Sequence, residues 1–145
     1  MPISDRAAGL VRTTWERLRP ASQDVARSMS ATLFAEHPSV MKLFDDADSD
    51  AARESFVLVI LEVVRSLDHP EVLTTEVVES GRRHVVYGVQ SVHYDALRAA
   101  LLAALATHLG ADFTTEVRLA WAAAYDGVAD VMRNAGEQVR AARPR

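Results

Sequence analysis

The chain contains no cysteine, and this single absence removes several kinds of chemistry. Disulfide frameworks, thiolate zinc sites, iron–sulfur clusters and cysteine nucleophiles all require a thiol. Glycine is also scarce, and the six glycines never gather into a loop of the kind that cradles phosphate. No serine or threonine has an evident histidine and aspartate partner, so hydrolase and kinase chemistry are not favoured.

Long apolar runs and a strong charge of one sign are missing as well. The longest apolar run is FVLVIL at 56–61, far below the roughly 20 residues that cross a bilayer. The first six residues already include charges and lead into no apolar stretch, so we expect no signal peptide, no membrane span and a cytoplasmic protein. Sixteen basic residues against 20 acidic ones give a net charge of −4, and the basic ones are scattered, so nucleic acid is not an expected partner.

Hydrophobic residues make up 49% of the sequence and recur at helical spacing along nearly all of it. Its length suits one domain over 1–145 with a core of its own. The spacing predicts six helices: between Ser4 and Pro20, between Ser22 and Pro38, over 51–67, from Thr74 or Thr75 to about Tyr87, over 94–109, and from near Thr114 onward, with a short turn at Val40, Leu43 and Phe44 after the second.

Caps and breakers mark the predicted helix ends. Ser4, Ser22, and Thr74 or Thr75 can cap the helices that follow them, as can the last Asp or Ser of the acidic loop DDADSD at 45–50. Gly88 and Gly110 break helices, and the arginine-rich tail after Gly136 is expected to fray. The valine-rich FVLVILEVV stretch also allows a buried strand, but its length and the spacing of its polar residues favour helix. We therefore predict an all-α protein with crossed packing around a central space.

Histidine is the residue type that raises a question of function. His37, His69, His93 and His108 fall in loops, turns or helix ends and suit surface or capping roles. No pair has the i, i+4 spacing of a helical zinc site. For His84 two interpretations stay open: a half-buried residue of an ordinary helix, which spacing alone favours, or the axial ligand of a flat apolar cofactor. The residues that could line such a pocket are Phe44, Phe56, Val89, Leu97 and Tyr125. Each of them, taken singly, is equally expected in an ordinary hydrophobic core.

Three segments, in this order and spacing, carry a resemblance to a known family. They are LFAEHPSVMKLF at 33–44, SGRRHVVYGVQSVHY at 80–94 and LGADFTTEVRLAWAAAYDGVADVM at 109–132. The chain resembles the globins, specifically the single-domain bacterial globins and the globin part of flavohaemoglobins, and is also similar to neuroglobin. The resemblance covers most of the length. It implies a globin fold of six to eight helices crossed around a pocket for haem b.

On the proximal side, the resemblance makes His84 the iron ligand and Phe44 the aromatic that packs on the haem face. Tyr94 matches a tyrosine that hydrogen-bonds near the proximal histidine and orients its ring. The glutamate that usually partners this tyrosine falls on Gly136, with Glu137 one residue late, so the chain departs from the family there. The resemblance also assigns Val89, Leu97 and Tyr125 to the haem pocket and Arg83 to a propionate.

On the distal side, ungapped counting places Ala52 where globins carry His or Gln, Phe56 where Leu or Val lines the pocket, and Ser30 where bacterial globins carry Tyr. O₂ in such a pocket draws negative charge onto its outer atom, so each lost donor costs roughly 1.5–3 kcal/mol and raises the off-rate about tenfold or more. NO and CO develop less charge, so ligand preference should shift toward them. Two alternatives for a distal polar group stay open. A register slip in the acidic loop would bring Arg53 or Glu54 inward, and Ser30 could donate a hydrogen bond through a water molecule.

Three functions follow from the resemblance. The first is a haem b protein that reversibly binds a diatomic gas, O₂, NO or CO, at a five-coordinate iron, for delivery, scavenging or sensing. The second is an NO dioxygenase that takes electrons from an external flavin reductase, since the chain ends about where the globin part of a flavohaemoglobin ends. Weak peroxidase activity is a further possibility, but that reaction needs a distal acid–base group and none is placed for it. The third is a haem-based sensor or interaction protein. We leave room for a homodimer.

Overall fold

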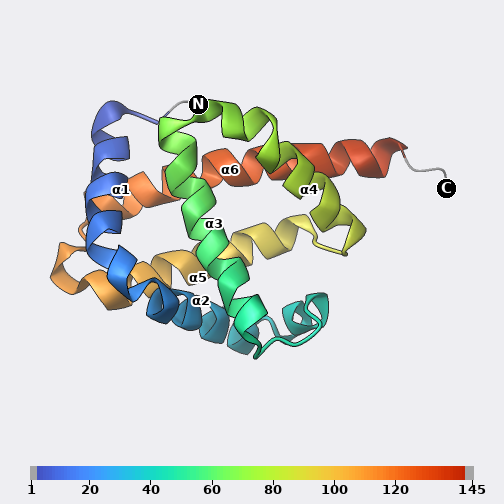
Figure 1. Cartoon of the computed structure of the whole chain (residues 1–145), viewed down its shortest axis with the longest axis horizontal. Helices are drawn as coiled ribbons and strands as arrows, with labels where there is room; N and C mark the ends of the chain where they lie inside the picture. Colours follow the sequence, from blue (N-terminus) through green and yellow to red (C-terminus); the bar gives the residue numbers. More distant parts are fainter. Residues whose placement is uncertain (1–2, 143–145) are drawn as a thin grey trace.

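The computed structural model describes residues 3–142, and its regular structure over that range is entirely helical (Figure 1). In chain order the elements are α1 (Asp5–Leu18), η1 (Arg19–Ala21), α2 (Ser22–Glu36), η2 (Pro38–Leu43), α3 (Asp50–Asp68), η3 (Pro70–Thr74), α4 (Glu76–Val86), α5 (Ser91–Leu109), η4 (Gly110–Asp112) and α6 (Thr115–Ala142), where η marks a 3₁₀ helix. The predicted all-α architecture is confirmed, and the stretch that also allowed a strand lies inside α3. Within this range, no helix combines the length and apolar character that a bilayer crossing needs.

Two helices begin with the side-chain caps that the sequence predicts. The Ser4 hydroxyl accepts a hydrogen bond from the Ala7 amide at 3.1 Å and opens α1. The Ser49 hydroxyl accepts one from the Ala52 amide at 3.1 Å and opens α3 directly after the acidic loop. Each cap satisfies one of the amides that a helix start leaves without a partner, and so fixes where the helix begins.

Two other predicted caps are wrong. Ser22 already lies inside α2, because η1 runs straight into that helix and Ala21 takes the cap position without a side-chain bond. The hydroxyls of Thr74 and Thr75 both donate to the Glu71 carbonyl, at 2.9 and 3.1 Å, and neither accepts a hydrogen bond from the start of α4. In both places a 3₁₀ turn leads directly into the helix, which removes the extended backbone that a capping residue needs.

The start of α5 also differs from the prediction. The helix begins at Ser91, three residues before Tyr94, so His93 lies in its first turn and not in a preceding turn. The Nδ1 atom of His93 accepts a hydrogen bond from the Gln90 amide at 2.8 Å and satisfies the backbone at this helix start. Histidine is an uncommon residue for this role, and its spacing gave no capping signal.

Helix ends follow the predicted breakers, except at the C-terminus. Gly88 and Gly110 have φ of +98° and +55°, a backbone conformation in which a side chain is strained. The tail was expected to fray after Gly136, but α6 continues to Ala142. Only 143–145 of that tail lie outside the described residues.

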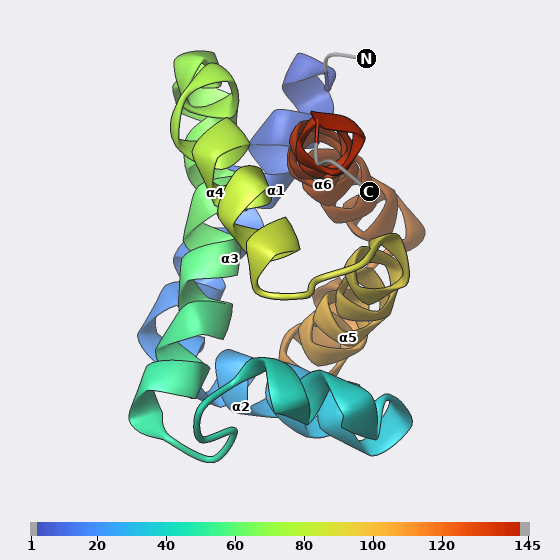
Figure 2. The same cartoon turned by 90° about the vertical axis from the view of Figure 1, so that its right-hand side faces the viewer.

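The six α-helices cross one another around a shared apolar core. Figure 1 shows α6 running the length of the molecule, where it packs against α1 and α4, while α2 packs against α3 and α5. In Figure 2, α3 and α4 form one side of the molecule, α5 and α6 the other, and α2 closes the bottom. The largest fully buried side chains are Trp121, Met29, Ile60, Leu101 and Leu105. The Trp121 indole N–H donates to the buried Thr14 hydroxyl at 2.9 Å, which joins α6 to α1.

Candidate functional site

His84 lies half-buried in the last turn of α4, with one ring nitrogen already engaged. Its Nδ1 atom lies 2.5 Å from the Ser80 carbonyl oxygen, one turn earlier, and 3.3 Å from the Ser80 hydroxyl. A carbonyl oxygen can only accept, so Nδ1 carries the proton and donates. A neutral imidazole has one N–H, and Nε2 therefore keeps a free lone pair. The ring is held in the tautomer that a metal ligand needs.

Two glycines determine how closely α4 lies on α6. A Cβ added at Gly81 would stand 2.6 Å from the Met132 carbonyl oxygen and 2.7 Å from its Cα atom, so the two backbones touch. A Cβ added at Gly136 would collide with the side chain of Val85. Since His84 lies between Gly81 and Val85 on one helix, these two close approaches set its position. Sequence reasoning assigned no such role to either glycine, although a glycine inside a helical pattern is the signal that points to one.

Three phenylalanines from three elements form one aromatic cluster. Phe44, just after η2, stacks on Phe56 of α3 with ring centroids 5.8 Å apart and planes at 26°. Both meet Phe34 of α2 edge to face, at 5.7 and 6.0 Å. The cluster brings together two residues that were predicted to line a pocket. Phe34 was not assigned to the pocket from the sequence.

Apolar side chains stay exposed where η2 meets the loop between α4 and α5. A Cβ added at Gly88 would lie 3.5 Å from the Leu43 side chain, so these two segments touch. The exposed large side chains in and beside this corner are Met41, Val86, Tyr87 and Val92, with exposed fractions from 40% to 65%. Neighbouring apolar side chains left open in this way commonly mark a binding surface.

The remaining residues predicted for the proximal side lie on α4, on α5 and in the loop between them. The Val89 amide donates to the His84 carbonyl at 2.9 Å and closes the loop after α4. Val89 and Leu97 are half-buried against the core, and Arg83 is exposed on α4. Burial raises the pKa of Glu62 on α3, and the charge of Arg83 opposes that rise. Arg83 therefore lies within electrostatic reach of α3.

The residues predicted for the distal side offer few hydrogen-bond donors. Ala52 and Phe56 are buried on α3 and have no polar side-chain atom. The Ser30 hydroxyl donates to a backbone carbonyl of its own helix at 3.0 Å. Arg53 forms an ion pair within α3, and Glu54 is exposed. The two donors that the sequence left open, Ser30 and Arg53, are thus both engaged within their own helices.

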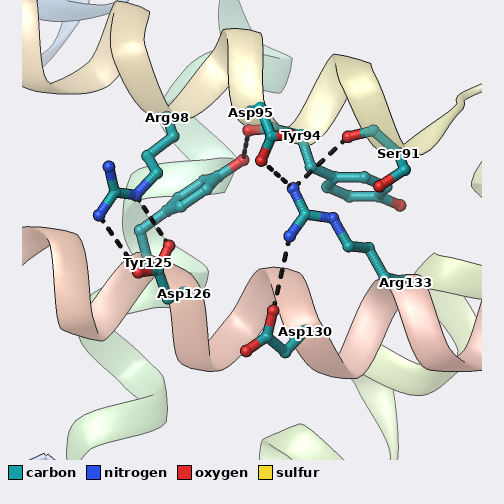
Figure 3. Close-up of polar contacts among 8 residues, drawn as sticks. All are labelled: Ser91, Tyr94, Asp95, Arg98, Tyr125, Asp126, Asp130 and Arg133. Atoms are coloured by element: carbon teal, nitrogen blue, oxygen red, sulfur yellow. Dashed lines mark hydrogen bonds and ion pairs between the residues drawn. The ribbon is translucent and has the colours of Figure 1, made fainter.

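Polar side chains of α5 and α6 form hydrogen bonds and ion pairs with one another, as Figure 3 shows. The Tyr125 hydroxyl donates to the Tyr94 carbonyl at 2.7 Å, and burial raises the pKa of Tyr125, so this donor stays protonated. The Arg133 guanidinium bonds to the Asp95 carboxylate and stands over the Tyr94 ring, with Cζ 5.4 Å from the ring centroid. Sequence reasoning missed Arg133, because only its contacts across the two helices distinguish it from a surface arginine.

The Tyr94 hydroxyl does not make the hydrogen bond that the resemblance implied. It is buried and has no hydrogen-bond partner among residues 3–142. No glutamate reaches it from α6 either, because Gly136 has no side chain and the Glu137 carboxylate pairs with Arg140. Burial raises the pKa of Tyr94, which keeps the phenol neutral. His84 is instead oriented by its own helix, through Ser80.

Comparisons with known proteins agree on one family. The sequence pattern of the globin family matches residues 28–132. The chain is 32% identical over 132 residues to a flavohemoprotein of Deinococcus radiodurans, covering 90% of this chain and 33% of that protein. It is 29% identical over 140 residues to a flavohemoprotein of Xylella fastidiosa, covering 95% and 35%. Cytoglobin-2 of Danio rerio is 28% identical over 134 residues, covering 83% and 75%.

Among solved structures, an engineered carbene transferase from Rhodothermus marinus, provisionally named a nitric oxide dioxygenase, has the same fold. It aligns with a TM-score of 0.84 and 29% identity over 96% of both chains. The chain spans only about a third of the length of the flavohemoproteins that it matches. The crossed helical fold and the match over most of the sequence show that this chain belongs to the globin family.

Proposed function

We propose that the chain is a haem b protein that reversibly binds O₂, NO or CO, with His84 as the axial ligand of a five-coordinate iron. The observation that carries the proposal is the 2.5 Å contact of His84 Nδ1 with the Ser80 carbonyl oxygen, which assigns a proton to Nδ1 and leaves Nε2 available to a metal. Ferrous haem supplies an open coordination position for a diatomic gas. The chain supplies an imidazole whose ring is oriented by Ser80 of the same helix.

The other proposed haem contacts come from the end of η2, from α3, α4, α5 and α6, and from the loop between α4 and α5. Phe44 stacks on Phe56, which gives a rigid aromatic surface at the end of η2. The residues proposed to wall the pocket are Val89, Leu97 and Tyr125. The Arg83 side chain is exposed and makes no hydrogen bond or ion pair within residues 3–142, so it is available to a propionate. The exposed apolar corner between η2 and α5 supports this placement, since a porphyrin would cover it.

We propose further that the pocket favours NO and CO over O₂. Ala52 has no donor, and the Ser30 hydroxyl and the Arg53 guanidinium bond within their own helices. O₂ depends on a donor more than NO or CO does, because more negative charge collects on its outer atom. Its residence time should therefore be short.

NO dioxygenase activity with an external reductase is the second candidate. Relatives named flavohemoprotein and a structural neighbour provisionally named a nitric oxide dioxygenase favour it. Any such turnover needs electrons for the iron, and we propose an external flavin reductase as their source. A short residence time for O₂ works against efficient turnover.

Absorption spectra of the ferric, ferrous and CO-treated protein test the proposal. A Soret band that moves on adding CO is expected for the parent and for the control His69→Ala, which removes an exposed histidine outside the site. His84→Ala should lose that band or bind hemin far more weakly. Hemin bound equally well by His84→Ala would refute the ligand assignment. Loss of NO with NADH and an added flavin reductase would favour the dioxygenase.

A further inference from the structure

A small cavity lies behind the histidine-bearing end of α4, between α4, α5 and α6. Its volume is about 10 Å³, the room that one water molecule needs. Val85 and Val89 contribute apolar lining, and polar groups come from Tyr94, Arg133 and the Glu137–Arg140 ion pair. Gly136 completes the wall on α6, where a side chain would collide with Val85.

Two fully buried polar atoms of the residues lining this cavity lack a hydrogen-bond partner within residues 3–142. They are the Tyr94 hydroxyl and the Arg133 Nε atom. The Tyr94 side chain is 8% exposed, and in Figure 3 its hydroxyl points away from the Asp95–Arg133 pair toward the start of α5. Buried polar atoms are nearly always paired, so this pair calls for a ligand.

The guanidinium group of Arg133 cannot rotate to bring Nε to a hydrogen-bond partner. Its terminal nitrogens bond to Asp95, to the Ser91 carbonyl at 3.4 Å and to Asp130 at 3.5 Å, so the group is fixed across α5 and α6. Nε can only donate, whereas a phenol both donates and accepts. One water molecule between them can accept from Nε and exchange a second hydrogen bond with the hydroxyl.

We propose that this cavity binds one water molecule that links the Tyr94 hydroxyl to Arg133 Nε, so that a cation and not a carboxylate ends the hydrogen-bond chain behind α4. Where it concerns the iron, this inference rests on the proposed function. A carboxylate in that place would strengthen the donation of the histidine to a metal, and an arginine cannot. Tyr94 is then a positioning residue of the α4, α5 and α6 junction, and the proton of His84 depends on Ser80.

Tyr94→Phe tests the water, because Phe keeps the ring under Arg133 and removes only the hydroxyl. With the water in place, the unfolding constant of the purified protein should rise about fivefold, the effect of one lost hydrogen bond. Tyr125→Phe, which removes a direct bond of 2.7 Å to the Tyr94 carbonyl, calibrates that loss. Unchanged or higher stability of Tyr94→Phe in a denaturant titration would overturn the proposal.

Two further readouts separate this inference from the proposed function. In the hemin-loaded ferrous protein, the iron–histidine stretching band should be the same for the parent and Tyr94→Phe, and a shifted band would overturn the proposal. A crystal structure should show water bonded to both atoms; a direct bond from Tyr94 to His84, Glu62 or Glu137 would also overturn it. If no hemin binds, the proposed function fails, while the stability comparison still decides the water.

Discussion

Adding one methyl group at Gly81 should push α4 away from α6 and weaken both the fold and the hold on His84. The added Cβ would stand 2.6 Å from the Met132 carbonyl oxygen, and ordinary contact begins at 3.4 Å, so the backbones must part by the 0.8 Å between these values. The obstructing atoms are backbone, so no side-chain rotation relieves the strain. Overpacking of this kind costs roughly 1–3 kcal/mol.

Gly127→Ala is the matched control. Gly127 lies inside α6 with nothing within 4 Å of an added Cβ, so alanine there should stabilise the protein by about 0.5–1 kcal/mol. The same helical gain applies at Gly81, and the difference between the two variants therefore isolates the clash. Denaturant titrations should place Gly81→Ala about 1–3 kcal/mol below Gly127→Ala, and hemin should leave Gly81→Ala faster. Equal stability of the two variants would refute the close contact of α4 with α6.

Three other predictions concern the distal side, the start of α5 and the core. Ala52→Gln should place a donor over the iron and slow O₂ release about tenfold or more in stopped-flow displacement, with little change for CO; equal slowing of both gases would contradict the donor argument. Burial lowers the pKa of His93, whose Nδ1 accepts from Gln90 at 2.8 Å, so stability should fall as pH drops below about 6.5, where the unfolded chain takes up the proton more readily. The His93→Gln variant keeps an acceptor and should lose that pH dependence in denaturant titrations. Thr14→Val removes the acceptor of the buried Trp121 N–H and should cost about 1–3 kcal/mol in a urea titration; a cost near zero would mean that the bond is not formed.

Local chemistry explains which helix boundaries could be predicted. Gly88 and Gly110 end helices through their own backbone angles, and Ser4 and Ser49 cap helices through amides three residues away. These signals act within one turn and can be read from neighbours in the chain. Ser22 was assigned wrongly because the preceding 3₁₀ turn had taken the cap position, which a single residue type cannot reveal.

Some residues of the candidate site could likewise be predicted from the sequence, and others could not. Resemblance to the globins selected His84 and Phe44, because the spacing of whole segments survives in the sequence. It also implied a partner for Tyr94, and the structure instead places Arg133 over its ring. That contact could not be predicted, since nothing in the spacing of α5 and α6 fixes their relative rotation. Ser80 was missed too, although its bond to His84 lies within one helix turn.

By itself, the sequence determined that this chain forms helices around an apolar core and that thiol chemistry is excluded, because those conclusions depend on composition and on spacing along each helix. The same spacing left the role of His84 open, and only the resemblance to the globins made it a proposed iron ligand. Tertiary structure alone decided that Gly81 meets Met132, that Phe44 stacks on Phe56, and that a water-sized cavity lies beside Tyr94. The physical reason is that each of these arises from packing between separate helices, whose rotation and separation depend on all their side chains together.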